Sequence, residues 1–347
     1  MIRVLIVDDS ALMRKRISDI LNSDSEIEVL DFAKTGAEAI KKAVKMKADV
    51  ITLDLSMPDI DGLTALTYIM NEVPTPVVII SANAAAGGPN ALKALELGAV
   101  EIVNKPSGEI SLDIETVDLE IIRKVKAASK VDVKRVRAVF NMFKNMAPAV
   151  RSKAPSGLSK IVAIGASTGG PQAIKEILPY FAADIPAAFL FVQHMPAGFT
   201  SSMAERLNWL TKIDIKEAKD GDIIQAGHGY IAPGDYHMVV EMHNYNAVIR
   251  LNTDPKVNRV RPSITVMMDS VVKVFGAKTI GVLLTGMGHD GVAGMRNIKN
   301  AGGVTFAEDK SSCVVYGMPR VAIEEGIIDK VLPISHMGLE IMKHINM

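Results

Sequence analysis

The alternation of short apolar runs with longer amphipathic stretches constrains the fold of this chain more than any other feature of its sequence. In the first part of the chain the apolar runs are 3–7, 29–33, 50–53, 77–80 and 100–103. The stretches between them have helical periodicity. Parallel strands need crossover connections, and right-handed crossovers place helices on both faces of a sheet. The sequence therefore predicts an α/β fold whose N-terminal part is a five-stranded parallel sheet.

A second series of apolar runs predicts a second sheet. Its main runs, each followed by glycine, proline or a polar loop, are 161–164, 187–192, 279–284 and 303–306. Three further runs have the length of antiparallel hairpin strands, namely 228–232, 237–241 and 247–251. The C-terminal part is thus predicted to be a doubly wound α/β domain with a short antiparallel hairpin region.

The segment between the two series differs in composition and predicts a linker. Residues 123–160 contain 11 basic residues and one acidic residue, although the whole chain has 39 of each. A short stretch at 136–146 has the pattern of a helix. The predicted organisation is an N-terminal domain at 1–128, a linker at 129–158 and a C-terminal domain at 159–347.

Length and composition exclude several classes of protein. A chain of 347 residues suits two domains of about 100 to 200 residues each. No apolar run approaches the roughly 18 residues of a membrane span, and the N-terminus reaches two aspartates before a signal-peptide hydrophobic region could form. The single cysteine, Cys313, allows neither an internal disulfide nor a thiolate metal cluster. We therefore expect a cytoplasmic protein without membrane insertion.

The basic segment also raises the alternative of a regulator with a DNA-binding output. It lacks a turn between two periodic helices, and its only aromatic residues are Phe140 and Phe143. We therefore expect no nucleic-acid partner and interpret the segment as a solvated linker or a partner-binding helix. Retention on DNA at physiological ionic strength would favour the alternative.

Polar and charged residues follow the predicted strands of the N-terminal domain. Asp8 and Asp9 follow the first strand, Asp54 the third, Ser81 the fourth and Lys105 the fifth. Because the carboxyl ends of parallel strands meet at one edge of a sheet, we expect all five side chains there. Three converging carboxylates repel one another unless a cation neutralises them, and oxygen ligands suit Mg²⁺. Asp54 can then act as nucleophile toward a phosphoryl group whose oxygens contact Lys105 and Ser81.

Single members of this group also have structural interpretations, since Asp9 could cap a helix that begins at Ser10 and Lys105 could be a surface lysine. Five matches in strand order favour aspartyl phosphorylation. The segments VDDS, DLSMPDIDG, IISA and NKP resemble the flavodoxin-like receiver domain of bacterial response regulators over residues 1–128. This resemblance implies a sensor histidine kinase as phosphodonor. Receiver domains usually carry an aromatic residue three positions before the lysine, where this chain has Ile102.

A glycine-rich turn follows the first predicted strand of the C-terminal domain. The strand KIVAIG leads into ASTGGP, where Gly165, Ser167 and Gly169 fit a strand-to-helix nucleophile elbow. The same pattern fits an anion site at a helix N-terminus, which needs no nucleophile. A nucleotide-binding module is disfavoured, because the turn lacks the lysine of a phosphate-binding loop and the glycine spacing of a dinucleotide fold.

A serine nucleophile needs a base, and His194 is the one of seven histidines that directly ends a fully apolar strand. Asp290 lies in the loop after the strand GVLLT and can orient the imidazole. His289 as the base would lack an orienting partner, because neighbouring residues point apart. We interpret His228 and His237, in the hairpin region, as structural or solvated, with a smaller chance of lining the cleft.

One member of this constellation also has a structural interpretation. Asp290 could instead cap a helix that begins near Val292. The placement of all three candidates at strand ends nevertheless favours a catalytic triad. Backbone N–H groups of the 285–288 loop, particularly that of Met287, and of Thr168 after the nucleophile could form the oxyanion hole.

Several segments from Lys160 onward resemble the catalytic domain of the protein-glutamate methylesterase family, namely IGASTGGP, FVQHMP, RPSI, LTGMGHDG and VVYGMPR. The resemblance implies Ser167 as nucleophile, His194 as general base, Asp290 as the orienting acid and Met287 as an oxyanion contributor. It also implies methyl-accepting chemoreceptors as substrates, with methanol released from methylated glutamate, and in many relatives deamidation of receptor glutamine. No cofactor is implied for the ester chemistry. We further hypothesise that the unphosphorylated receiver domain covers the triad and that phosphorylation loosens this contact.

Overall fold

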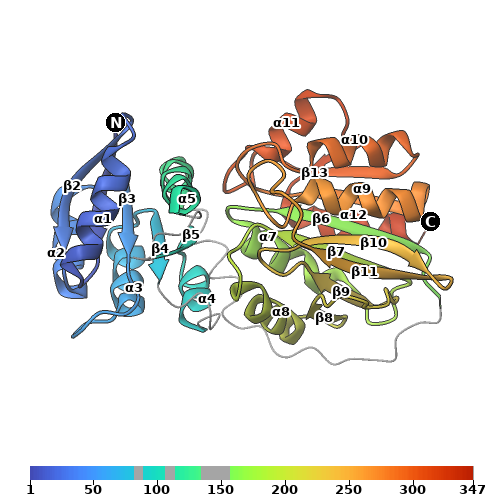
Figure 1. Ribbon diagram of the computed structural model, residues 1–347, viewed down its shortest axis with the longest axis horizontal. Coiled ribbons are helices and arrows are strands. Elements are labelled where there is room, and N and C mark those ends of the chain that lie inside the picture. The colour runs from blue at the N-terminus through green and yellow to red at the C-terminus, as the bar shows by residue number, and fades with distance from the viewer. Residues whose placement is uncertain (82–88, 106–113, 134–156, 347) are drawn as a thin grey trace. The chain divides into compact units, whose positions relative to one another are not determined.

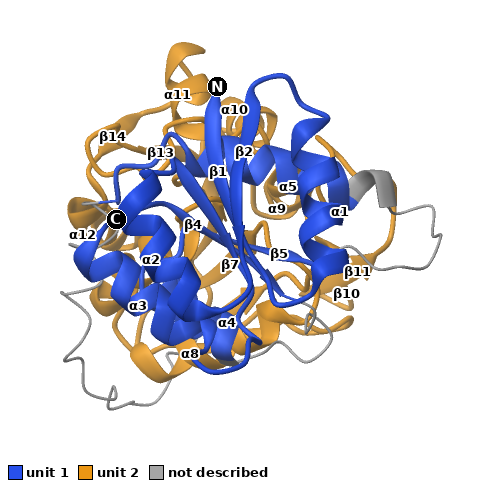
Figure 2. Cartoon of the chain, turned by 90° about the vertical axis from the view of Figure 1, so that its left-hand side faces the viewer, with its two compact units in different colours: residues 1–144 blue, residues 145–347 orange. Residues whose placement is uncertain are grey.

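The chain divides into two compact units, residues 1–144 and 145–347 (Figure 2). The computed structural model of the protein describes residues 1–81, 89–105, 114–133 and 157–346. The helix predicted at 136–146 and most of the predicted linker lie outside the described residues. The domain boundaries at 128 and 158 therefore stay predictions.

The N-terminal unit contains a five-stranded sheet in the order β2-β1-β3-β4-β5, with every neighbouring pair parallel. Its strands are β1 (Ile2–Val7), β2 (Ile27–Ala33), β3 (Val50–Leu53), β4 (Val77–Ser81) and β5 (Glu101–Asn104). The helices are α1 (Ala11–Asn22), α2 (Gly36–Met46), α3 (Gly62–Glu72), α4 (Pro89–Glu96) and α5 (Ile114–Ala128). The predicted flavodoxin-like domain is confirmed.

The first three helices of this unit begin at side chains that cap their free N–H groups. The Ser10 side chain accepts a hydrogen bond from the Met13 N–H in the first turn of α1. The Thr35 side chain likewise accepts from the Glu38 N–H in the first turn of α2. Asp61 Oδ1 accepts from Thr64 N at 2.7 Å ahead of α3. Ser10 is therefore the N-cap of α1, so the capping role considered for Asp9 is wrong. Polar residues at these positions leave the ends of the neighbouring strands free to carry functional groups.

The C-terminal unit is built on a seven-stranded sheet in the order β14-β13-β12-β6-β7-β9-β8, with every neighbouring pair parallel. Its strands are β6 (Lys160–Ala166), β7 (Ala187–Gln193), β8 (Asp214–Glu217), β9 (His228–Ile231), β12 (Thr279–Leu283), β13 (Val304–Glu308) and β14 (Lys330–Leu332). Its α-helices are α7 (Gly170–Ile177), α8 (Phe199–Leu210), α9 (Ile264–Phe275), α10 (Val292–Asn300), α11 (Met318–Glu324) and α12 (Ile334–Ile345), with 3₁₀ turns at Leu178–Tyr180 and Gly276–Lys278. The predicted doubly wound domain is confirmed.

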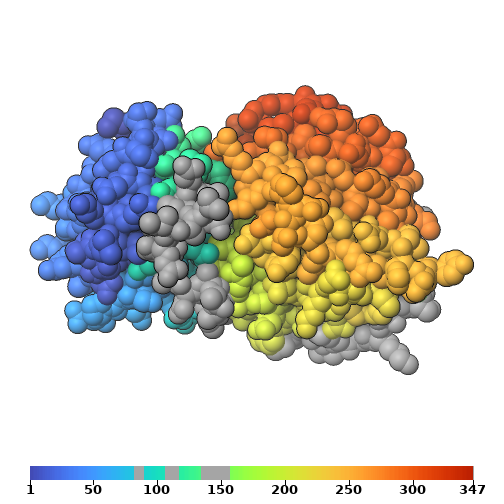
Figure 3. Space-filling model, viewed as in Figure 1, coloured from blue at the N-terminus to red at the C-terminus, as the bar shows by residue number. Residues whose placement is uncertain are grey.

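The antiparallel region consists of two strands, β10 (His237–His243) and β11 (Asn246–Asn252). The prediction of a third hairpin strand at 228–232 was wrong, because that segment forms β9 of the parallel sheet. Phe189 of β7 pairs with Gly229, and Tyr230 and Ile231 of β9 are buried. Burial on both faces suits a parallel strand better than a hairpin edge. The turn of the hairpin projects from the surface of the unit (Figures 1 and 3).

Alternating side chains of β7 fill two separate parts of the core. Leu190 and Val192 pack with α9 and α10 residues on one face, and Phe189 and Phe191 point to the other, where Phe181 stacks on Phe189. Figure 1 shows α9 and α10 on one side of the sheet and α7 and α8 on the other. The strand ends between these helical layers are where polar residues gather. In the described residues, no helix is long and apolar enough to cross a bilayer.

Candidate functional sites

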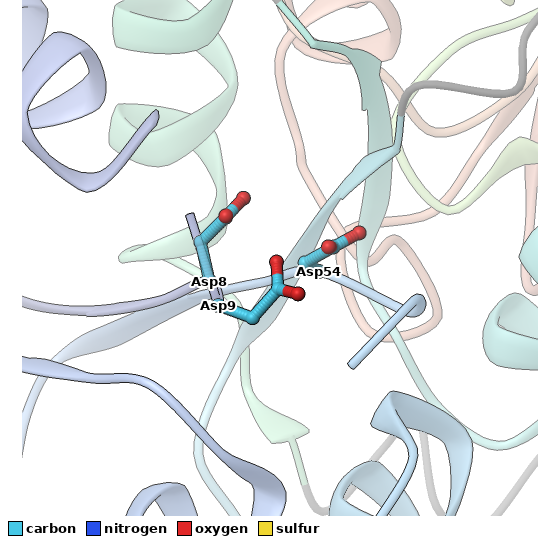
Figure 4. Close-up of side chains that lie close together, drawn as sticks. All are labelled: Asp8, Asp9 and Asp54. Carbon is cyan, nitrogen blue, oxygen red and sulfur yellow. The ribbon is translucent and has the colours of Figure 1, made fainter. Parts of the chain in front are cut away.

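Three carboxylates meet at the carboxyl edge of the N-terminal sheet. Asp8 and Asp9 follow β1 and Asp54 follows β3, and an oxygen of each lies within 4.8 Å of the others (Figure 4). Asp8 and Asp54 are buried, whereas Asp9 is exposed. The strands bring these residues together because β1 and β3 are neighbours in the sheet.

Lys105 and Ser81 complete this edge. Lys105 Nζ lies 2.8 Å from both Asp8 Oδ2 and Asp54 Oδ2, with hydrogen-bond angles satisfied only toward Asp54. The Lys105 N–H donates to the Ser81 carbonyl at 2.9 Å, so the ends of β4 and β5 are joined. Burial raises the pKa of Asp54 and outweighs the opposing effect of Lys105, with Asp8 adding repulsion. All five predicted residues therefore lie at one edge.

The chemistry of this acidic site fits a hard divalent cation. Asp8 Oδ2 is a buried carboxylate oxygen without a directed hydrogen bond from any described residue. Mg²⁺ prefers hard oxygen ligands, usually from one or two carboxylates and a phosphate, and it retains several waters. Asp8, Asp9 and Asp54 are the residues that would hold such an ion.

In the C-terminal unit, Ser167 lies directly after β6 in a tight turn. The Gly170 N–H donates to the Ser167 carbonyl at 2.8 Å, and Gly169 has φ of 79°, a left-handed conformation that favours glycine. A Cβ atom on Gly165 would lie 2.3 Å from Ile264 Cγ2, so only glycine fits beneath the turn. The turn then leads into α7. Both features agree with the predicted nucleophile elbow.

His194 lies beside Ser167 because their strands are in register. Ala166 of β6 pairs with Gln193 of β7, and each candidate is the next residue on its strand. The His194 N–H donates to the Ala166 carbonyl at 3.1 Å, which holds the two strand ends together. Within the described residues, no hydrogen bond joins the Ser167 hydroxyl to the imidazole. Hydrogen bonds of catalytic groups often form fully only when substrate is bound.

The imidazole of His194 is held by Asp290. His194 Nε2 lies 2.9 Å from Asp290 Oδ2, and both side chains are buried. Because an ionised carboxylate only accepts hydrogen bonds, Nε2 carries the proton in this contact. His194 Nδ1 is buried without a hydrogen-bond partner among the described residues. The ring is thus oriented by one nitrogen, and the other is available to accept a proton.

Asp290 receives more hydrogen bonds than His194 alone supplies. Its oxygens accept from Ser263 Oγ at 2.8 Å and from Asn258 Nδ2 at 3.0 Å, and from the Ile264 and Thr265 N–H groups at 2.7 and 3.3 Å. Burial alone would raise the pKa of Asp290, but the bonds from His194, Ile264 and Asn258 outweigh it and hold the pKa well below the ordinary value. Asp290 is therefore a fixed negative charge.

The capping role considered for Asp290 needs a correction. Helix α10 has Gly291 as its N-cap and no side-chain cap, so Asp290 does not cap the helix that follows it in sequence. It accepts instead from N–H groups at the start of α9. A helix N-terminus carries a partial positive charge that stabilises a carboxylate. The partner helix is 26 residues away in sequence, which no local pattern could indicate.

The other histidines considered in the sequence have different environments. His289 is exposed, unlike its neighbour Asp290. His228 Nδ1 lies 2.9 Å from the Ala226 carbonyl, and its ring lines an open surface pocket that also contains Tyr230. His237 is buried, with both ring nitrogens hydrogen bonded. The structure therefore brings only His194 to Asp290.

The loop proposed to form the oxyanion hole is tightly held at its start. Thr285 Oγ1 donates to the Thr168 carbonyl at 2.9 Å, and the Thr285 N–H donates to Glu308 Oε2 at 2.8 Å. Burial raises the pKa of Glu308 to about 7. Met287, two residues further, is partly buried. Both predicted contributors, Met287 and Thr168, thus belong to segments joined through Thr285 beside the nucleophile.

Sequence reasoning missed Asn258, Ser263 and Glu308. Ser263 had one detectable signal, because a serine ahead of the apolar run ITVMMDSVV predicts a helix N-cap, which it is. Its second contact, with Asp290, depends on tertiary packing. Asn258 and Glu308 carry no local signal of their roles.

One unit with an acidic phosphorylation-type site and another with a Ser/His/Asp cluster define a class of protein, the response regulators with an enzymatic output. Residues 4–115 match the response regulator receiver domain family, and residues 162–341 match the CheB methylesterase family. The chain belongs to the CheB methylesterase family. The prediction that it is an enzyme of the methylesterase class is confirmed.

Related proteins match the chain over nearly its whole length. A protein of Pyrococcus horikoshii named protein-glutamate methylesterase/protein-glutamine glutaminase is 45% identical over 344 residues, which cover 99% of this chain and 93% of the relative. A protein of Archaeoglobus fulgidus with the same name is 45% identical over 342 residues, covering 98% and 97%. The crystal structure of the Thermotoga maritima CheB methylesterase catalytic domain is 44% identical, with a TM-score of 0.53, and covers 54% of this chain and 98% of that domain.

Proposed function

We propose that the protein is a phosphorylation-activated hydrolase of the cytoplasm that removes methyl groups from glutamate methyl esters on chemoreceptor helices and deamidates receptor glutamines. The names of the full-length relatives support this substrate class. The observation that carries the proposal is the bond between His194 Nε2 and Asp290 Oδ2, with Ser167 at the adjacent register position of the next strand.

In the first half of the reaction Ser167 Oγ attacks the ester carbonyl carbon. Its proton passes to His194 Nδ1, the ring nitrogen that has no other hydrogen-bond partner among the described residues. The bond to the methoxy group then breaks, and the imidazolium gives its proton to the departing methanol. With a glutamine substrate the leaving group is ammonia. The product on the enzyme is a glutamyl ester of Ser167.

In the second half water attacks this glutamyl ester, and His194 takes a proton from the water. The imidazolium then protonates Ser167 Oγ as the acyl bond breaks, which releases the glutamate carboxylate. Asp290 stays ionised throughout, because its hydrogen bonds hold its pKa low, and it stabilises the imidazolium in both steps. The N–H groups of Met287 and Thr168 bind the oxyanion.

In the N-terminal unit Asp54 is the phosphoryl acceptor, and a sensor histidine kinase is the donor. Mg²⁺ held by Asp8, Asp9 and Asp54 would neutralise charge on the phosphoryl oxygens. Lys105 can move from the carboxylates to a phosphoryl oxygen, and the Ser81 hydroxyl can donate to another. The new charge at this edge biases the receiver domain toward a state that exposes Ser167.

Methanol release from methylated chemoreceptor membranes tests the esterase function. The full chain should release methanol, and Ser167→Ala should release none above background. Ser159→Ala is a matched control, because Ser159 lies just before the opposite end of the same strand and, among the described residues, its hydroxyl donates to the Pro186 carbonyl. Unchanged methanol release by Ser167→Ala would rule out the proposed nucleophile.

The activation is tested with a small phosphodonor and Mg²⁺. Methanol release by the full chain should rise with the phosphodonor, and release by Asp54→Ala should stay at the unstimulated rate. Equal stimulation of both proteins would exclude control through Asp54.

A further inference from the structure

His237 is a second buried histidine in the C-terminal unit, and both of its ring nitrogens are hydrogen bonded. The Ser263 N–H donates to His237 Nδ1 at 3.2 Å, and His237 Nε2 lies 3.2 Å from the Pro255 carbonyl. A nitrogen that accepts from an N–H group carries no proton, so Nε2 is the donor to Pro255. The side chain is 1% exposed. These two contacts therefore fit one tautomer of His237, with the proton on Nε2.

These two bonds join the ends of one segment, residues 255–263. Asn258 lies inside this segment and donates to Asp290 Oδ1 at 3.0 Å. Asn258 and its neighbour Arg259 both have positive φ, 53° and 64°. Left-handed backbone at two consecutive residues other than glycine is strained and persists only where surrounding contacts hold it. The ring of His237 supplies such a contact at each end of the segment.

The segment leads directly into the N-terminus of α9, the other source of donors to Asp290. Ser263 Oγ, the Ile264 N–H and the Thr265 N–H all donate to Asp290, at 2.8, 2.7 and 3.3 Å. The Ser263 residue thus bonds His237 through its backbone and Asp290 through its side chain. Among the described residues, every donor to Asp290 other than His194 comes from this segment or from the first turn that it precedes.

We propose that His237 is a positioning residue of the triad. By holding the Ser263 N–H it fixes the start of α9, and through it the rotation of Asp290 and the orientation of the His194 ring. This proposal rests on the proposed function, because it assumes that Ser167, His194 and Asp290 are the catalytic groups. Displacements of about 1 Å in such groups can reduce turnover about 100-fold.

Three substitutions separate this role from general support of the fold. His237→Asn places an amide oxygen near the position of Nδ1, so the Ser263 N–H keeps an acceptor. His237→Gln places an amide nitrogen near the position of Nε2, so only the bond to Pro255 is kept. His237→Leu removes both bonds. If the function of the ring is to hold Ser263, the Asn variant should keep activity that the Gln variant loses.

The measurement is steady-state methanol release by the full chain with each variant. We expect kcat to fall about 100-fold in His237→Leu, about 10-fold in His237→Gln and less than about 3-fold in His237→Asn. KM should not change, because a buried side chain does not contact the substrate. Should His237→Leu fail to fold, the comparison between Asn and Gln still decides. Equal kcat values for Asn and Gln, or a change confined to KM, would overturn the proposal.

A second readout follows the His194 ring directly. The proton between His194 Nε2 and Asp290 Oδ2 should give a downfield ¹H NMR signal, which we expect to shift or disappear in His237→Gln and to persist in His237→Asn. An unchanged signal in His237→Gln would contradict the proposal.

The matched control is His228→Asn. His228 also lies at the start of a strand and bonds a backbone carbonyl through its ring, but it makes no contact with the 255–263 segment among the interactions of the described residues. Its kcat and NMR signal should equal those of the unchanged chain. Failure of the proposed function would appear separately, as activity remaining in Ser167→Ala.

Discussion

The two sites of this protein treat buried carboxylates in opposite ways. At the acidic site Asp8 and Asp54 share one cation, Lys105, and burial raises the pKa of Asp54. At the triad Asp290 accepts hydrogen bonds from five groups, and these hold its pKa well below the ordinary value. The acidic site therefore leaves the negative charge of its carboxylates poorly compensated, whereas the carboxylate of Asp290 is surrounded by hydrogen-bond donors.

This difference agrees with the functions that we propose for the two sites. A site that receives a cation and a phosphoryl group binds the cation more tightly when its carboxylates are poorly compensated. A carboxylate that orients an imidazole must keep one position and one charge through the reaction. In this protein, the number of donors around each buried carboxylate therefore separates the site that can accept a cation from the site that is held rigid.

The largest expected effect is at the saturated carboxylate. Asp290→Asn keeps the shape of the side chain but replaces an acceptor oxygen with a donor nitrogen that opposes the His194 N–H or the α9 N–H groups. We expect kcat for methanol release to fall about 1,000- to 10,000-fold, as it does when an orienting carboxylate becomes an amide in another triad. His289→Gln, which changes the exposed neighbour, should retain full activity. A loss of less than tenfold in Asp290→Asn would show that the saturated carboxylate is not needed.

The N-terminal unit also contains a buried charge that is surrounded by partners, the ammonium of Lys124. Lys124 is buried in α5, donates to the Ile102 carbonyl at 2.6 Å and lies 3.1 Å from carboxylate oxygens of Glu101 and Glu120. Lys124→Met would leave Glu101 buried without its cation, so we expect a loss of about 3 to 5 kcal/mol in unfolding free energy. Hydrogen exchange of β5 amides in the full chain measures it.

The double variant Lys124→Met with Glu101→Leu controls this experiment. It removes both charges, so it should recover much of the stability lost in the single variant. If it were no more stable than Lys124→Met, the loss would come from packing and not from the buried charge of Glu101.

The third prediction concerns the cation that the acidic site already contains. Lys105→Ala removes the ammonium that lies 2.8 Å from Asp8 and Asp54, so Mg²⁺ no longer competes with it. We expect Mg²⁺ to bind about tenfold more tightly, measured by isothermal titration calorimetry. Lys41→Ala, at an exposed position of α2, should leave binding unchanged. Weaker binding in Lys105→Ala would show that Lys105 and Mg²⁺ do not compete for the carboxylates.

The smallest effect is expected at Glu308, whose pKa burial raises from the ordinary 4.5 to about 7. Between these pH values the folded chain binds a proton that the unfolded chain does not, so this group's contribution to stability falls as pH rises. Glu308→Gln does not titrate, and its Tm relative to the unchanged chain should rise by a few degrees from pH 5 to pH 8. Glu324→Gln, at an exposed position, should show no such trend. An equal Tm difference at both pH values would contradict the raised pKa.

Much of both sites could be predicted from strand ends alone. Asp8, Asp54, Ser167 and His194 each directly follow a mainly apolar strand, and the structure places each at the carboxyl edge of its sheet. The prediction of a third hairpin strand was wrong because the run at 228–231 is short and alternates in polarity only weakly. Periodicity describes one strand at a time and does not reveal which strand lies beside it.

The sequence by itself therefore determined the two α/β units, most of their strands and the side chains that end those strands, but it revealed neither β8 nor β14. Only the tertiary structure decided that Asp290 meets the start of α9 and not of α10, and that His237 holds the segment leading there. The physical reason is that strand and helix signals arise from neighbours in sequence. The donors around a buried carboxylate come from elements that packing brings together across tens of residues.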